Sequence, residues 1–82
     1  MKVHLLKTEE KYWTAVDCYG KDFELRKDDR DFQTNDTVCL FKGQNINMAE
    51  EVITRRIGYI LRGPDAERFG LQAGYCIFGL CL

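Results

Sequence analysis

The stretch "KDFELRKDDRD", residues 21–31, carries nine charged side chains in eleven positions. Its first half alternates in character, because Phe23 and Leu25 are apolar and their neighbours are charged. This pattern is typical of a half-buried β-strand, in which successive side chains point to opposite faces of a sheet. We therefore predict a strand with Phe23 and Leu25 in the core and with Glu24 and Arg26 on the opposite face.

Glu24 and Arg26 lie two residues apart on that predicted strand, so their opposite charges are close enough to pair. A solvent-exposed ion pair contributes only about 0–1 kcal/mol to stability. A partly buried pair costs desolvation energy, and proteins commonly accept that cost at functional sites. From the residues alone, the stretch fits both a solvated surface strand and the wall of a polar cleft.

Length and charge limit the remaining possibilities. The 82 residues suffice for one domain, spanning residues 1–82, and the formal net charge is −1. A protein that binds nucleic acid through bulk charge is usually basic, so any such binding here requires a local patch. No apolar run approaches the roughly 20 residues of a membrane span, and the N-terminus lacks a signal-peptide pattern. We therefore expect a cytoplasmic protein that does not contact membranes.

One candidate patch is "TRRIGYILR", residues 54–62, where Arg55, Arg56 and Arg62 have no acidic residue among them. Cations combined with the ring of Tyr59 are suited to binding single-stranded nucleic acid. The same residues also fit the charged end of a solvated strand, and the sequence does not separate these two interpretations.

Periodicity and turn residues predict an α+β fold. Thr8 is a suitable N-cap for a helix over residues 8–19, and Gly20 suits the position after its C-terminus. Pro64 is placed to start a short helical turn, and Gly58 indicates either a bulge or a close backbone approach. Residues 42–50 are predicted as a turn or loop. The predicted strands cover residues 3–6, 22–27, 37–41, 51–62 and 75–82. This order favours a small curled sheet or barrel covered by one helix.

The four cysteines are scattered, without a C-x-x-C pair, and the chain has a single histidine. Zinc sites usually show paired ligands at short spacing. We therefore predict four reduced, buried thiols, with no zinc, no disulfide and no cofactor. Carboxylates at residues 28, 29 and 31 are suited to a divalent cation, but no second cluster of ligands accompanies them.

The run "GKDFELRKDDRDFQTND", residues 20–36, resembles the signature G-x-K-x-x-E-x-R of the ASCH (activating-signal-cointegrator homology) domains, a branch of the PUA-like superfamily. It is most similar to a family of short bacterial and phage proteins of unassigned function within that branch. The signature glycine falls on Tyr19 here, and Asn35 replaces a second glycine. The matching residues are distributed over nearly the whole chain: His4, Leu6, Lys7, Tyr12, Trp13, Lys21, Phe23, Glu24, Arg26, Lys27, Asp29, Arg30, Phe32, Asp36, Tyr59, Ile60, Leu61, Gly74 and Tyr75.

This resemblance implies a small PUA-like mixed β-barrel of five or six strands, with one main helix and a short helical turn. A cleft is expected between the barrel and the first helix, with RNA or a nucleoside or nucleotide as its ligand. Cationic side chains supply donors to phosphate or base, and Glu24 accepts from an exocyclic amine. The candidate binding residues are Lys21, Glu24, Arg26, Asp29, Arg30 and Tyr59.

Two alternatives remain open. Some ASCH proteins are enzymes, which implies a small hydrolase acting on RNA or on a modified nucleoside. Its candidate catalytic residues are Lys21, Glu24 and His4, the only imidazole available as a general base near neutral pH. His4 equally fits a structural role on its strand. The third possibility is a phage-type module that binds a protein partner without cleft chemistry.

Overall fold

The computed structural model describes residues 1–49 and 51–82, and it confirms the predicted α+β class. Glu50, the last residue of the predicted loop, lies outside the described residues. In the described part of the chain, no helix is both long enough and apolar enough to cross a membrane. The elements follow one another as β1 (Val3–Lys7), α1 (Glu10–Cys18), β2 (Phe23–Lys27), β3 (Thr37–Phe41), the 3-10 helix η1 (Ile46–Met48), β4 (Val52–Leu61), α2 (Pro64–Glu67) and β5 (Tyr75–Cys81).

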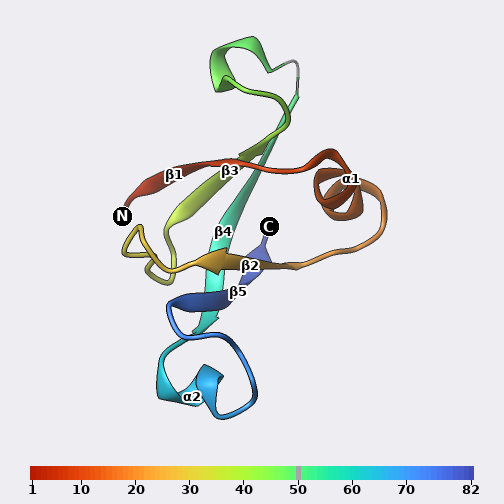
Figure 1. The fold of residues 1–82 in the computed structure, drawn as a ribbon. Coiled ribbons are helices and arrows are strands. Elements are labelled where there is room, and N and C mark those ends of the chain that lie inside the picture. Colours follow the sequence, from red (N-terminus) through yellow and green to blue (C-terminus); the bar gives the residue numbers. More distant parts are fainter. Residues whose placement is uncertain (50) are drawn as a thin grey trace.

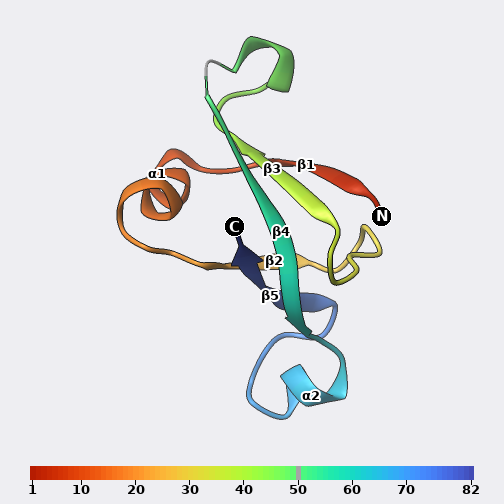
Figure 2. The same ribbon diagram turned by 180° about the vertical axis from the view of Figure 1, so that it is seen from behind.

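The five strands form one mixed sheet in the order β1-β3-β4-β5-β2 (Figures 1 and 2). β1 pairs with β3 in parallel, and every other pairing is antiparallel. β1 and β2 are therefore the two edges of the sheet, and no strand pairing joins them. The sheet is strongly twisted but is not closed into a barrel by its hydrogen-bonded ladder.

The elements lie close to their predicted positions, but the start of α1 differs and the 3-10 helix η1 forms within the predicted loop. Glu9 rather than Thr8 is the N-cap, and no side chain caps the helix. The Thr8 hydroxyl is buried and donates to the carbonyl of Leu6. The predicted bulge is confirmed, because the pairing of β4 with β5 shifts register between Ile57 and Ile60, around Gly58.

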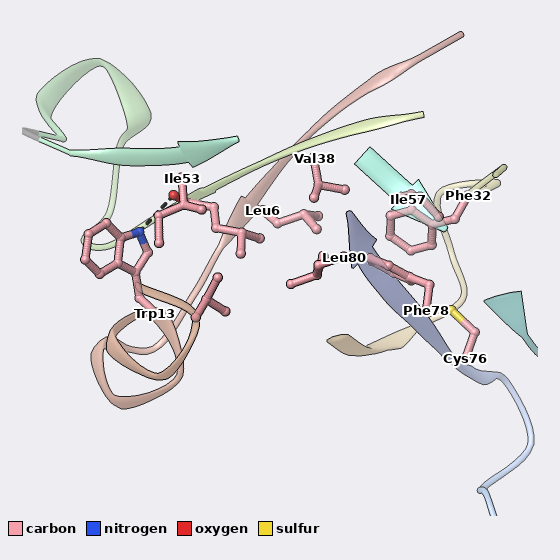
Figure 3. Close-up of a cluster of buried hydrophobic side chains, with 11 residues drawn as sticks. Leu6, Trp13, Phe32, Val38, Ile53, Ile57, Cys76, Phe78 and Leu80 are labelled. Atoms are coloured by element: carbon pink, nitrogen blue, oxygen red, sulfur yellow. Dashed lines mark hydrogen bonds between the residues drawn. The ribbon is translucent and has the colours of Figure 1, made fainter. Parts of the chain in front are cut away.

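A single apolar core fills the space between the inner face of the sheet and α1 (Figure 3). Trp13 and Val16 are the buried residues of α1, four and seven positions after its N-cap, so one stripe of the helix faces the sheet. The Trp13 indole nitrogen donates to the Leu40 carbonyl at 3.0 Å, which fixes the helix against β3. The remaining members of the cluster are Leu6, Phe32, Val38, Leu40, Ile53, Ile57, Cys76, Phe78 and Leu80.

The predicted facing of β2 is wrong. Phe23 and Leu25 are 48% and 52% exposed, whereas Glu24 is only 4% exposed. The pairing with β5 sets this orientation, because Glu24 lies opposite the fully buried Phe78. Apolar residues normally occupy the buried face, but here neighbouring cations compensate the buried carboxylate, as described below.

The prediction of four buried thiols is also wrong in part. Cys76 on β5 is fully buried, and burial raises the pKa of its thiol. Cys18 is exposed at the end of α1, because the helix turns this position away from the sheet. Cys39 and Cys81 are partly exposed on the outer face of the sheet.

Candidate ligand-binding cleft

A cleft with a volume of about 760 Å³ lies between α1 and β2. Its walls come from the end of β1, from one face of α1, from the turn after α1 and from β2. The lining residues are Lys7, Thr8, Glu9, Tyr12, Ala15, Tyr19, Gly20, Lys21, Phe23, Glu24, Leu25 and Arg26. The first half of the charged stretch, residues 21–26, therefore forms one side of this cleft.

The turn after α1 brings Lys21 to the floor of the cleft. Gly20 has a φ of 70°, a left-handed conformation that glycine adopts without steric cost. The Lys21 amide then donates to the Ala15 carbonyl at 3.0 Å, a backbone bond that turns the chain back against the end of the helix. The helix ends there, and the Lys21 side chain runs towards β2.

Lys21, Glu24 and Arg26 form an ion triad on the cleft floor. Lys21 Nζ lies 2.7 Å from Glu24 Oε1, and Arg26 Nε lies 2.9 Å from Glu24 Oε2. Lys21 Nζ also donates to the Phe23 carbonyl at 2.6 Å. Two cations therefore share one buried carboxylate, which leaves the triad with one surplus positive charge. Charge-assisted bonds at both carboxylate oxygens offset the desolvation cost of Glu24.

Two arginines connect the edge strands that the sheet leaves unpaired. Arg26 donates to the Lys7 carbonyl at 3.1 Å and to the Thr8 hydroxyl at 3.0 Å. Arg30 donates to the Leu5 carbonyl at 2.7 Å. These bonds reach from β2 and the loop after it to the backbone of β1. Arg26 thus joins the cleft floor to the opposite edge of the sheet, whereas Arg30 lies outside the cleft lining.

Aromatic side chains surround the surplus charge. Tyr12 and Tyr19 are seven positions apart and lie on the same side of the helical segment, and both line the cleft. Lys21 Nζ is 5.0 Å from the centroid of the Phe23 ring and 6.0 Å from that of Tyr12. Sequence reasoning assigned neither tyrosine to a cleft. The cleft roles of Thr8, Tyr12, Tyr19, Phe23 and Leu25 were therefore missed.

His4 lies in the core and does not line the cleft. Its Nε2 is 2.9 Å from Asp36 Oδ2, and its ring packs edge-on against Phe32. Asp36 also accepts hydrogen bonds from the backbone amides of Lys2 and Gln33. These bonds, the one with His4 first, lower the pKa of Asp36 to about 2. The pair ties β1 to the loop that precedes β3.

The other candidate residues are scattered. Asp29 is exposed in the loop after β2, and Tyr59 is 76% exposed in the bulge of β4. Neither lines the cleft. The structure therefore brings together only three of the candidate binding residues: Lys21, Glu24 and Arg26.

The aspartates considered as cation ligands are largely engaged by basic side chains. Arg62 Nε lies 2.9 Å from Asp28 Oδ2, and Lys2 Nζ lies 3.0 Å from Asp31 Oδ2. Within residues 1–49 and 51–82, no three potential metal ligands come together.

Fold and site define a class of protein: a small α+β domain with a five-stranded mixed sheet and a triad-floored cleft beside its main helix. The chain belongs to the family described as "Domain of unknown function (DUF3850)", whose sequence profile matches residues 3–80. A comparison with the curated proteins gives no significant match.

Proposed function

We propose that this chain is an ASCH-type module of the PUA-like class that binds RNA or a nucleotide in the cleft between α1 and β2. One observation carries the proposal: a cationic triad lies on the floor of a cleft with aromatic walls. The cleft volume of about 760 Å³ suits a ligand of nucleotide size, since small-molecule sites span about 300–1,000 Å³.

The chemistry of each part matches such a ligand. Aromatic rings such as Tyr12, Tyr19 and Phe23 provide stacking surfaces for a base. Lys21 donates two hydrogen bonds within the protein, so its third N–H remains for a phosphate or a base oxygen. Each Glu24 oxygen accepts one of the triad's bonds and keeps a lone pair for an exocyclic amine.

The barrel expected of a PUA-like domain forms part of this proposal. The bonds of Arg26 and Arg30 to the carbonyls of Lys7 and Leu5 bridge the open side of the sheet. In the proposed description, these side chains take the place of the last strand pairing and complete a barrel-like enclosure. A ligand of this class also implies a cytoplasmic location.

The hydrolase alternative receives less support from the geometry. Lys21 and Glu24 bind each other, and both Glu24 oxygens already accept a bond from a cation. Neither group is therefore free to take a proton from a substrate or a water without breaking the triad. His4 is buried against Asp36 rather than directed at the cleft.

Calorimetric titration with nucleosides, nucleotides and short RNAs tests the proposal. Tyr19→Ala is the first variant, because Tyr19 is 80% exposed and its removal does not threaten the core. We expect affinity to fall by roughly 5- to 150-fold, since stacking of one base contributes about 1–3 kcal/mol. Arg68→Ala is the matched control, because this exposed arginine stacks on Phe69 beyond α2 and away from the cleft. Unchanged binding by Tyr19→Ala, or no binding of any of these ligands, would refute the proposal.

A second variant separates binding from stability. The double substitution Lys21→Met with Glu24→Leu replaces the buried carboxylate and one of its cations by apolar side chains, which is often neutral or stabilising, and Arg26 keeps its bonds to Lys7 and Thr8. We expect the variant to unfold at a denaturant concentration close to that of the parent, but to lose nucleotide binding. Chromatography of the same mixtures detects turnover, and product formation by the parent chain would favour the hydrolase alternative. Nucleotide binding that survives in a folded double variant would refute the role of the triad in binding.

A further inference from the structure

A second hollow of about 350 Å³ adjoins the cleft. Gly20 and Lys21 line both hollows, so the turn after α1 is their common wall. The first half of β4, the end of β5 and the second buried position of α1 complete the lining of this hollow. Its lining residues are Val16, Gly20, Lys21, Asp22, Arg55, Leu80 and Leu82.

Arg55 is the one arginine of "TRRIGYILR" that lines this hollow. Arg62 pairs with Asp28, and Arg56 donates to the Asn35 side chain at 3.0 Å. Arg55 donates only to the Thr54 carbonyl at 3.0 Å, and it pairs with no carboxylate in residues 1–49 and 51–82. Most of its guanidinium donors therefore remain for a ligand.

The pairing of β3 with β4 puts the two adjacent arginines on opposite faces. Arg55 lies opposite the buried Val38, so it belongs to the inner face of the sheet, which α1 covers. Arg56 lies opposite Thr37 on the outer face. The two arginines thus have the same charge and the same strand, but only one of them faces the hollow.

Gly20 contributes no side chain to the wall that the two hollows share. A Cβ atom built on this residue would meet no other atom within 4 Å. One ligand that spans the two hollows would therefore cross the backbone of Gly20, where no side chain stands between them.

We propose that the second hollow is a phosphate subsite, in which Arg55 binds the phosphate of a nucleotide whose base occupies the cleft. This inference rests on the proposed function and assigns its ligand to the phosphorylated class. A guanidinium with free donors matches a phosphate through paired hydrogen bonds. Asp22 lines the same hollow and opposes an anion there, so its carboxylate limits the affinity that Arg55 provides.

The test compares a nucleoside with its 5′-monophosphate on the same protein by calorimetry. For the parent chain, the monophosphate is expected to bind more tightly than the nucleoside. Arg55→Ala should reduce monophosphate affinity roughly tenfold or more, the loss expected for a charge-assisted hydrogen bond, and leave nucleoside affinity unchanged. Arg56→Ala, the matched control, should leave both unchanged. Asp22→Asn should strengthen monophosphate binding alone.

The outcomes separate failure of the proposed function from failure of the phosphate subsite. If neither compound binds, the proposed function itself fails. If the nucleoside binds but the monophosphate binds no more tightly, the phosphate subsite is refuted while the cleft proposal stands. Equal effects of Arg55→Ala and Arg56→Ala on the monophosphate would also refute the subsite, because a diffuse charge effect would then explain the binding.

Discussion

Arg26→Ala should be the most destabilising single substitution in the triad. Arg26 bonds to Glu24 and also reaches two acceptors on the other edge of the sheet, Lys7 and Thr8. The side chain of Lys21, in contrast, donates its hydrogen bonds to Phe23 and Glu24, which lie within three residues of it. The loss of Arg26 therefore removes contacts between distant parts of the chain, whereas the loss of Lys21 removes local ones.

The loss in the free energy of unfolding can be estimated from these contacts. Two lost hydrogen bonds to β1 contribute about 1 kcal/mol each. Removing one partner of a fully buried ion pair costs about 3–5 kcal/mol. That cost is smaller here, about 1 kcal/mol, because Lys21 still neutralises Glu24 and the Arg26 side chain is 23% exposed. The sum is about 3 kcal/mol for Arg26→Ala, against about 1–2 kcal/mol for Lys21→Ala.

Urea denaturation followed by tryptophan fluorescence measures both values, because Trp13 is buried in the core and becomes exposed on unfolding. For a domain of this size, about 3 kcal/mol corresponds to a fall in Tm of roughly 15 °C. Arg26→Lys should recover less than half of the loss, because one ammonium cannot reproduce the arginine's fork of donors. Lys27→Ala on the same strand is the control and should change stability by less than about 0.5 kcal/mol. Equal losses for Arg26→Ala and Lys21→Ala would refute the view that Arg26 holds the two edges together.

Three further outcomes are expected. The pKa of Asp36 lies at about 2, below its ordinary value, so the stabilising effect of this carboxylate is complete above about pH 4 and is lost as the pH falls towards 2. Thermal unfolding measured from pH 2 to 6 should show this loss of stability. In Asp36→Asn, stability should depend less on pH over the same range. Gly58→Ala should cost about 1–2 kcal/mol in denaturant unfolding, because its Cβ would lie 2.9 Å from Cys81 Sγ, and Cys81→Ala should restore most of the loss. Alkylation followed by mass spectrometry should label the exposed Cys18 first and the buried Cys76 last, and metal analysis should find no stoichiometric zinc.

Much of the fold could be predicted from local sequence signals. Short segments predicted several elements that the structure confirms. These are the strands β3 and β5, from their continuous apolar runs, the short helix α2, from the glycine and proline at its start, and the bulge of β4, from its glycine. The facing of β2 could not be predicted in this way. Alternation shows that two faces differ, but which face is buried depends on the pairing with β5 and on cations elsewhere in the chain.

The candidate site was only partly predictable for the same reason. Lys21, Glu24 and Arg26 are close in sequence, so their proximity follows from the geometry of one strand and one turn. The cleft walls required knowledge of how α1 packs. Tyr12 lies directly before the buried Trp13, and helical periodicity alone does not show where the buried stripe of a helix ends and its exposed border begins.

The cost of the triad gives a reason to regard it as a site rather than as a device for stability. An apolar residue in place of Glu24 would face Phe78 and the core without a desolvation penalty, and buried ion pairs are frequently no better than apolar substitutes. Arg26 could still bridge to β1 through its bonds to Lys7 and Thr8 without a carboxylate beside it. The carboxylate and Lys21 are therefore dispensable for joining the edges of the sheet. The Glu24 carboxylate does, however, hold the cationic side chains of Lys21 and Arg26 in place at the floor of an aromatic cleft. Recognition of a small polar ligand requires such pre-organisation.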